Sequence, residues 1–268
     1  MRIRIINLAS SPDRLAFQAQ QFQSLGLSFE RLEAQTTSDF NQAQYQAAGF
    51  NWERPLSQPE YACYLSHKKA WLDVISADEP TLILEDDACI SQCLPAFLDA
   101  VEARTYCDFI TLEARRRKKV IAKSGVEVTS GISLHRLYLD RSGAAAYILW
   151  PEGAKKLLSL ESQRGAALAD AQICRAFSLR AYQAKPALVV QADCATHYHL
   201  QEPFEIKSTI WNGPRTLAPV QSKRLALRFK VNRILSQLRM AGRILLTILP
   251  SIERTLPSVD ASHFKVGQ

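Results

Sequence analysis

A short apolar run that ends in three consecutive carboxylates restricts the fold of this chain more than any other feature. Residues 80–84 (Pro-Thr-Leu-Ile-Leu) predict a buried strand, and Glu85, Asp86 and Asp87 follow it directly. Neighbouring anions raise one another's pKa and repel unless a cation lies among them. Open α/β sheets bind their ligands at the carboxyl ends of their strands. The cluster therefore favours an α/β fold with a site at this strand end, and a solvated acidic turn is the alternative.

The same cluster indicates the chemistry of the site. Hard carboxylate oxygens suit Mg²⁺ or Mn²⁺, and these cations also bind phosphate oxygens. A strand, an acidic cluster, a divalent metal and a diphosphate together are typical of enzymes that use a nucleotide-sugar donor. We therefore expect a metal-assisted transfer site after residue 84.

Alternating strand and helix patterns extend the α/β prediction along the chain, with a mostly parallel sheet flanked by helices in a Rossmann-like manner. Strands are expected at residues 2–8, 29–32, 80–84, 107–112, 143–150, 181–184 and 188–191. Helices are expected at residues 12–25, 58–75, 94–103, 154–160 and 170–177. Ser57 and Glu60 form a capping box for the second helix, and Asp170 is expected to cap the last one. Residues 36–54 are polar and predict irregular or weakly helical structure.

Positive charge is concentrated near the carboxyl end. The formal net charge is +7, but residues 1–205 hold 22 basic and 24 acidic residues, which gives −2. Residues 222–249 have a helical period with arginines away from one apolar stripe, which consists of Leu227, Val231, Ile234, Leu238, Ala241, Leu245 and Ile248. We expect Ser222 to Leu249 to bind an anionic membrane surface, and packing on the body or on a second subunit is the alternative. Nucleic acid is not an expected partner, because these cations lack interleaved aromatic residues.

Three further features bear on the compartment and on phosphate binding. The apolar stretch in residues 1–8 is too short for a signal peptide. Six cysteines without a CxxC pair are expected to be reduced thiols, which points to the cytoplasm. The five consecutive cations from Arg115 to Lys119 predict either a solvated loop or a clamp for phosphates.

Several blocks of the sequence, in the same order, resemble glycosyltransferase family 25, which includes bacterial lipopolysaccharide and lipooligosaccharide β-galactosyltransferases. They cover residues 1 to about 210 and are Ile6-Asn7-Leu8 with Asp13-Arg14, residues 60–67 (Glu-Tyr-Ala-Cys-Tyr-Leu-Ser-His) with Trp71, residues 84–87, residues 143–147 (Gly-Ala-Ala-Ala-Tyr), Ala169-Asp170, and Lys185-Pro186 with Gln191 and Ser208. One departure is Ala62-Cys63, where the family usually has Gly-Cys. The resemblance implies a GT-A-like domain at residues 1–221, a UDP-sugar donor and a divalent metal. Residues 222–268 lie outside the blocks and are expected to form a membrane-peripheral helical tail.

The site roles combine this resemblance with the positions of the residues. Asp87 and Glu85 are the predicted metal ligands, with His197 preferred to His199 as a third, although a lone histidine is more often structural. The predicted donor-binding residues are Asn7, Leu8, Arg14, Ser66, His67, Glu85, Asp86 and Gln191, with Ser208 as a further contact; core packing is the alternative for Ser66 and His67. Transfer with inversion, which only the resemblance implies, needs a carboxylate base. Asp170 is the candidate, with simple helix capping as its alternative, and Glu113 and Asp193 are the reserves.

The resulting hypothesis is a metal-dependent inverting hexosyltransferase on the cytoplasmic side of the inner membrane. The resemblance implies transfer of galactose from UDP-galactose to a lipopolysaccharide or lipooligosaccharide core. A metal-dependent phosphohydrolase using the same carboxylates is the first alternative, and a non-catalytic membrane-surface binding protein is the second.

Overall fold

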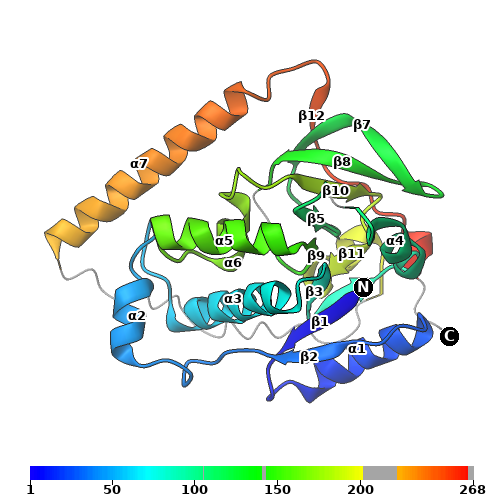
Figure 1. Ribbon diagram of the computed structural model, residues 1–268, viewed down its shortest axis with the longest axis horizontal. Coiled ribbons are helices and arrows are strands. Elements are labelled where there is room, and N and C mark those ends of the chain that lie inside the picture. Colours follow the sequence, from blue (N-terminus) through cyan, green and yellow to red (C-terminus); the bar gives the residue numbers. More distant parts are fainter. Residues whose placement is uncertain (105, 141–142, 202–221, 265–268) are drawn as a thin grey trace.

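The computed structural model describes residues 1–104, 106–140, 143–201 and 222–264 (Figure 1). Its centre is a nine-stranded sheet in the order β12-β7-β8-β10-β5-β9-β3-β1-β2. These strands are β1 (Arg2–Asn7), β2 (Glu30–Glu33), β3 (Thr81–Glu85), β5 (Phe109–Thr111), β7 (Lys119–Thr129), β8 (Ile132–Leu139), β9 (Ala146–Leu149), β10 (Ala181–Lys185) and β12 (Ile252–Thr255). A three-stranded sheet consists of β4 (Ala88–Ile90), β11 (Val189–Gln191) and β6 (Glu113–Ala114).

Helices cover both faces of the large sheet, which confirms the predicted α/β class. The helices are α1 (Pro12–Ser24), α2 (Gln42–Ala48), α3 (Gln58–Ala77), α4 (Leu94–Val101), α5 (Pro151–Arg164), α6 (Ala169–Cys174) and α7 (Lys223–Leu245), with short 3-10 turns η1 (Ala192–Cys194), η2 (Thr196–Tyr198) and η3 (Ala261–Phe264). One buried cluster joins the sheet to α2, α3, α5 and α6, and a second joins the opposite face to α1 and α4. Parallel pairing links β2, β1 and β3, and also β5 and β10, while β9 is antiparallel to both of its neighbours.

Local signals explain the elements that position the site. Ser57 and Glu60 form the predicted capping box of α3, in which each side chain accepts a hydrogen bond from the other residue's backbone N–H. Asp170 does not cap α6, which corrects the sequence prediction. The extended backbone of Leu168 starts the helix two residues earlier, so the Asp170 carboxylate lies in the first turn.

The hairpin of β7 and β8 was not predicted. β7 begins at Lys119, and most of its later residues are exposed, so its sequence resembles a polar loop. Gly131 has a φ of +74° in the turn between the two strands, a conformation that glycine adopts without strain. The hairpin adds an antiparallel part to the sheet.

The described residues after the predicted boundary, 222–264, comprise a projecting helix and a segment that packs on the body. After α7 the chain returns to the sheet, where β12 pairs antiparallel with β7. Further along, Ala187 and Val259 form a β-bridge, and the side chain of Phe264 is buried. Of the residues after the predicted boundary that the structure describes, only those of α7 project from the sheet, on the side of α5 (Figure 1).

The predicted apolar stripe of α7 faces away from the body. Leu227, Leu238 and Leu245 are 61%, 63% and 69% exposed, whereas Phe229 on the opposite side is buried. Asn232 donates hydrogen bonds from its side-chain amide to the carbonyls of residues 51 and 52, which fixes the helix against the loop after α2. Among the helices described, none has the length and apolar character needed to cross a bilayer.

Candidate active site

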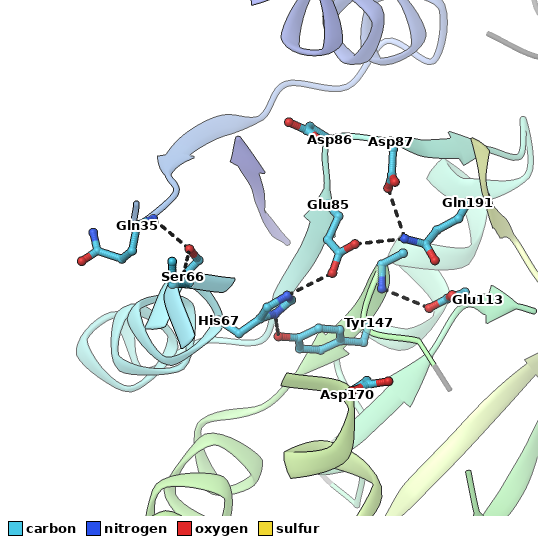
Figure 2. Close-up of polar contacts among 12 residues, drawn as sticks. Gln35, Ser66, His67, Glu85, Asp86, Asp87, Glu113, Tyr147, Asp170 and Gln191 are labelled. Atoms are coloured by element: carbon cyan, nitrogen blue, oxygen red, sulfur yellow. Dashed lines mark hydrogen bonds and ion pairs between the residues drawn. The ribbon is translucent and has the colours of Figure 1, made fainter. Parts of the chain in front are cut away.

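Strand β3 distributes its carboxylates between the two faces of the sheet. Leu82 and Leu84 pack towards α1 and α4, and Ile83 packs towards α3. Because side chains alternate along a strand, Glu85 continues the face of Ile83 and Asp86 continues the face of Leu84. Figure 2 shows the resulting separation, with Glu85 directed towards His67 on α3 and Asp86 directed away from it.

Asp86 is buried in a network with β1 and α1. Its Oδ2 accepts a hydrogen bond from Asn7 Nδ2 at 2.8 Å, and its Oδ1 pairs with Arg14 at 3.1 Å. Arg31 in turn donates to Asn7 Oδ1 at 3.0 Å. Burial raises the pKa of Asp86, while Asn7 and Arg14 oppose that rise. The structure thus brings three predicted donor residues together, and the Arg14 guanidinium neutralises part of the acidic cluster.

Glu85 is held by a chain of buried polar groups that starts on α3. Its Oε1 lies 3.2 Å from His67 Nε2, and His67 Nδ1 lies 2.9 Å from the Tyr147 hydroxyl, as Figure 2 shows. Trp71 Nε1 donates to the same hydroxyl at 2.9 Å. The hydroxyl proton is then directed at His67 Nδ1, so that His67 Nε2–H donates to Glu85. The chain fixes the direction in which the Glu85 carboxylate points.

Gln191 connects Glu85 to Asp87. Its side-chain amide nitrogen donates to Glu85 Oε2 at 3.0 Å and to Asp87 Oδ1 at 3.3 Å (Figure 2). Burial first, and then the charges of Glu85 and Asp86, raise the pKa of Asp87. Such a rise is what carboxylates show when they are gathered without a cation. Two partly exposed carboxylates held at a common amide therefore fit a hard divalent cation such as Mg²⁺ or Mn²⁺, which can reach them from solvent.

The predicted ligand set of Asp87, Glu85 and His197 is not gathered into one group. Among the described residues, a group of three possible ligand atoms within 4.8 Å of one another consists of Cys63, His67 and Glu85. Burial and the charge of Glu85 raise the pKa of the Cys63 thiol, and cations such as Mg²⁺ and Mn²⁺ prefer oxygen ligands to sulfur. His197 is exposed on η2, where its ring lies 4.8 Å from that of Tyr198. Its neighbour His199 ends this turn with a φ of +59°.

Three carboxylates, those of Asp170, Asp193 and Glu113, are candidates for the base. Asp170 accepts a backbone hydrogen bond from Ala171 at 2.7 Å, and its pKa is raised mainly by burial. Glu85 also raises it, which indicates that Asp170 lies within electrostatic reach of the acidic cluster. Asp193 is exposed and forms an ion pair with Arg115 at 2.6 Å.

Glu113 is buried behind the loop that leads into β9. Its Oε2 accepts from the backbone N–H of Ala145 at 3.0 Å (Figure 2). Gly143 in the same loop has a φ of +85°, and a Cβ atom there would collide with the Glu113 carboxyl group. The glycine of this block is therefore required by the close approach of Glu113 as well as by its backbone conformation.

A fall in stability with rising pH is expected from Glu113. Burial raises its pKa to about 8 from an ordinary value of 4.5, so the folded protein binds a proton that the unfolded chain lacks between these values. The free energy of unfolding should fall on the order of 2 kcal/mol between pH 6 and pH 9 through this group. Urea unfolding of the wild type and of Glu113→Gln at both pH values measures it, and the variant should show a smaller fall. An equal fall in both proteins would contradict the prediction, and Glu127→Gln, at an exposed position, is the matched control.

The remaining predicted residues have structural contacts or lie outside the described part. The Ser66 hydroxyl accepts from Gln35 N and donates to Ala62 O, so it joins α3 to the loop after β2 (Figure 2). Leu8 is partly buried and packs against the core cluster of α3. Ser208 lies outside the described residues.

The five-cation run divides into inward-facing and exposed residues. Lys119 is buried and forms an ion pair with Asp140 at 2.7 Å, and Arg115 pairs with Asp193. Residues 116–118 are exposed. Neither the solvated loop nor the phosphate clamp describes the whole run, because both of its ends are used for folding.

Sequence reasoning did not identify Tyr147, Arg31 or the function of Trp71 as a donor. Tyr147 is the polar residue in an otherwise apolar strand, which is a usable signal, because a buried hydroxyl needs a partner. Arg31 reaches Asn7 only because β1 and β2 pair in parallel, with Ile5 opposite Arg31. No local pattern could have indicated that contact.

A family model and a sequence relative both describe glycosyltransferases. The sequence model of "Glycosyltransferase family 25 (LPS biosynthesis protein)" matches residues 1–171. A protein named lacto-N-neotetraose biosynthesis glycosyltransferase LgtE, from Neisseria gonorrhoeae, is 28% identical over 167 residues. The matched region covers 59% of this chain and 60% of that relative.

Solved structures give more distant similarities. A galactosyltransferase, LgtC, in complex with donor and acceptor sugar analogues, has a TM-score of 0.43 and 11% identity, and the match covers 86% of this chain and 96% of that one. A glycosyltransferase involved in glycosylation of the major capsid of PBCV-1 has a TM-score of 0.38 and 11% identity, with coverage of 71% and 92%.

Proposed function

This chain belongs to glycosyltransferase family 25, and from that premise we propose that it transfers galactose from UDP-galactose to a lipopolysaccharide or lipooligosaccharide core saccharide. The observation that carries the proposal is the acidic cluster after β3, with the partly buried Glu85 and Asp87 joined by Gln191. The relative's name refers to lacto-N-neotetraose biosynthesis, which supports an oligosaccharide acceptor.

Asp87 and Glu85 would hold a divalent metal ion beside the diphosphate of the donor. When bound, such a cation supplies charge stabilisation for the departing diphosphate. The protein's contribution is to keep the two carboxylates in place: Gln191 holds both, and the chain from Trp71 through Tyr147 and His67 holds Glu85. Asp86, fixed by Asn7 and Arg14, is the residue proposed to face the ribose.

The transfer step needs a base for the acceptor. The acceptor hydroxyl oxygen forms a bond to the anomeric carbon, its proton passes to a carboxylate, and the bond from the anomeric carbon to the diphosphate oxygen breaks with the electron pair leaving on UDP. Attack from the face opposite the leaving group inverts the anomeric configuration. Asp170 is the proposed base, since burial brings its pKa closer to neutral pH, where a base is most effective.

The direct test measures UDP release from UDP-galactose with Mn²⁺, in the presence and absence of a core oligosaccharide. Release that requires the acceptor supports transfer. UDP-glucose in place of UDP-galactose tests the choice of hexose. Release of UMP or phosphate without any acceptor would contradict the proposal and favour a phosphohydrolase.

We also propose that α7 binds the cytoplasmic surface of the inner membrane. Its exposed stripe includes Leu227, Leu238 and Leu245. Lys223, Arg224 and Lys230 are exposed and lie on or beside the stripe by helical position, so an anionic bilayer complements both the charge and the apolar face. Each cation near such a surface adds about 1 kcal/mol of attraction.

Removing part of the stripe should weaken binding to vesicles. For Leu238→Ser combined with Leu245→Ser, we expect at least about tenfold weaker sedimentation with phosphatidylglycerol vesicles, because each leucine loses about 1.5–3 kcal/mol of burial. Transfer to a soluble acceptor should stay unchanged. The matched control is Leu72→Ser on α3, where the leucine is 50% exposed but lies away from α7. Unchanged vesicle binding in the double variant would mean that α7 packs on another protein or a second subunit.

A further inference from the structure

A cavity of about 800 Å³ separates α7 from α5 and α6. Four arginines from three elements line it: Arg164 at the end of α5, Arg175 directly after α6, and Arg228 and Arg239 on α7. Their convergence on one cavity sets them apart from Arg224 and Arg233 of α7, which do not line it. The cavity does not include the acidic cluster or Asp170.

The positive charge in the cavity is only partly balanced. Two carboxylates line it, Glu53 and Glu161, and Glu161 already pairs with Lys68 at 2.9 Å. Within the described part of the chain, Arg164 and Arg239 have no ion-pair partner. Neutral oxygens are the acceptors for the other two arginines: Arg228 donates to Phe50 O, and Arg175 donates to Gly165 O and Gln172 Oε1.

The pKa values of the arginines are consistent with an excess of positive charge in the cavity. The pKa of Arg175 is lowered to about 10, mainly by burial; the charges of Arg164 and Arg239 act in the same direction, while Tyr64 and Glu53 oppose them. Arg239 also lowers the pKa of Arg164. Guanidinium groups that lower one another's pKa are stabilised by an anion placed between them. Planar guanidinium groups match phosphate oxygens with two parallel hydrogen bonds.

Helix α6 connects the proposed transfer site to the cavity. Helix α6 begins beside Asp170 and ends beside Arg175, and its six residues span about 9 Å. This separation is on the order of the length of one or two sugar units.

We propose that the cavity lined by Arg164, Arg175, Arg228 and Arg239 binds a phosphate group carried by the acceptor saccharide. This inference rests on the proposed glycosyl transfer for the identity of the ligand, but not for the phosphate chemistry. The bound phosphate would orient the acceptor, and α7 would thereby form one wall of the acceptor site.

The binding test uses glucose 6-phosphate as the probe, titrated calorimetrically in the presence of EDTA. Asp87→Ala serves as the background, so that the donor site does not contribute. Adding Arg164→Gln and Arg239→Gln should weaken binding at least tenfold, whereas Arg224→Gln with Arg233→Gln, two exposed positions outside the cavity, should not. Thermal melting of both double variants checks that they fold. No saturable binding in the background, or equal loss in both pairs, would overturn the proposal.

A second measurement identifies the source of the phosphate. In the protein with Asp87 intact, the double variant Arg164→Gln with Arg239→Gln, here called the cavity pair, should have an at least tenfold higher KM for a phosphorylated core oligosaccharide. Its KM for the dephosphorylated oligosaccharide should be unchanged. If the cavity pair instead weakens only phosphatidylglycerol vesicle binding, the anion is a lipid headgroup and the acceptor assignment is overturned. If UDP-galactose is not used at all but glucose 6-phosphate still binds as described, the transfer proposal fails while the phosphate site stands.

Discussion

Replacing Asp87 with alanine is expected to reduce the proposed galactose transfer by about a thousandfold, because the site would lose a carboxylate proposed to hold the cation beside the leaving diphosphate. Metal-dependent binding of UDP should be lost with it. Calorimetric titration of UDP with and without Mn²⁺ measures binding, and acceptor-dependent UDP release measures transfer. The variant should be at least as stable as the wild type at pH 8, because the raised pKa of Asp87 shows that its charge is unfavourable in the folded protein without metal.

Two controls separate this loss from a general effect. Asp87→Asn keeps the size of the side chain but removes the charge, and it should behave like the alanine variant. Asp99→Ala removes an exposed carboxylate on α4 and should change neither measurement. If UDP binds the wild type equally well with and without metal, the acidic cluster is structural.

Replacing Asp170 with asparagine is expected to lower the rate of transfer by about 10²–10⁴-fold, the usual contribution of a general base. Binding of UDP and Mn²⁺ should remain, because Asp170 has no hydrogen bond to Glu85, Asp87 or Gln191 in the described structure. Asparagine retains an oxygen for the Ala171 N–H, so the start of α6 should be preserved. Steady-state kinetics should show a fall in kcat with little change in the KM for the donor.

Steady-state kinetics of variants at the two other candidate carboxylates, Asp193 and Glu113, test whether Asp170 is the base. Asp193→Asn removes an exposed group paired with Arg115, and its effect should be small. Glu113→Gln should affect stability and its pH dependence more than the rate, since Glu113 is buried against Ala145. A larger rate loss in either of these variants than in Asp170→Asn would transfer the role of base to that residue.

Strong local signals explain why much of the central fold could be predicted. Pro12 and Pro151 lie in the first turns of α1 and α5, the capping box starts α3, and the apolar residues 81–84 form most of β3. The hairpin of β7 and β8 and the edge strand β12 have no comparable signal. β7 and β12 are partly exposed and rich in polar residues, so pairing with other strands determines their structure.

The site likewise combines residues that a local sequence pattern identifies with contacts that only the folded chain brings together. The end of β3 could be recognised from three adjacent carboxylates, and Asn7 and Gln191 from strand ends. The choice of His67 rather than His197 as the histidine beside Glu85 depends on how α3 packs against β3, which no sequence spacing encodes. For α7, the period identified the apolar stripe correctly, but the side that faces the body was decided by Phe229 and Asn232.

Helix α7 is attached to the body near both of its ends. Arg228 and Asn232 bind the carbonyls of residues 50–52, and the chain after the helix enters β12 at Ile252. A helix held in this way has already lost most of its conformational freedom, so adsorption to a bilayer has little further entropy cost. It also cannot swivel about a flexible joint, so an adsorbed enzyme would keep one tilt and one height above the lipid headgroups. The acceptor sugars within reach would then be those at a single distance from the membrane, which makes the geometry of attachment a determinant of where on a growing saccharide chain the sugar is added.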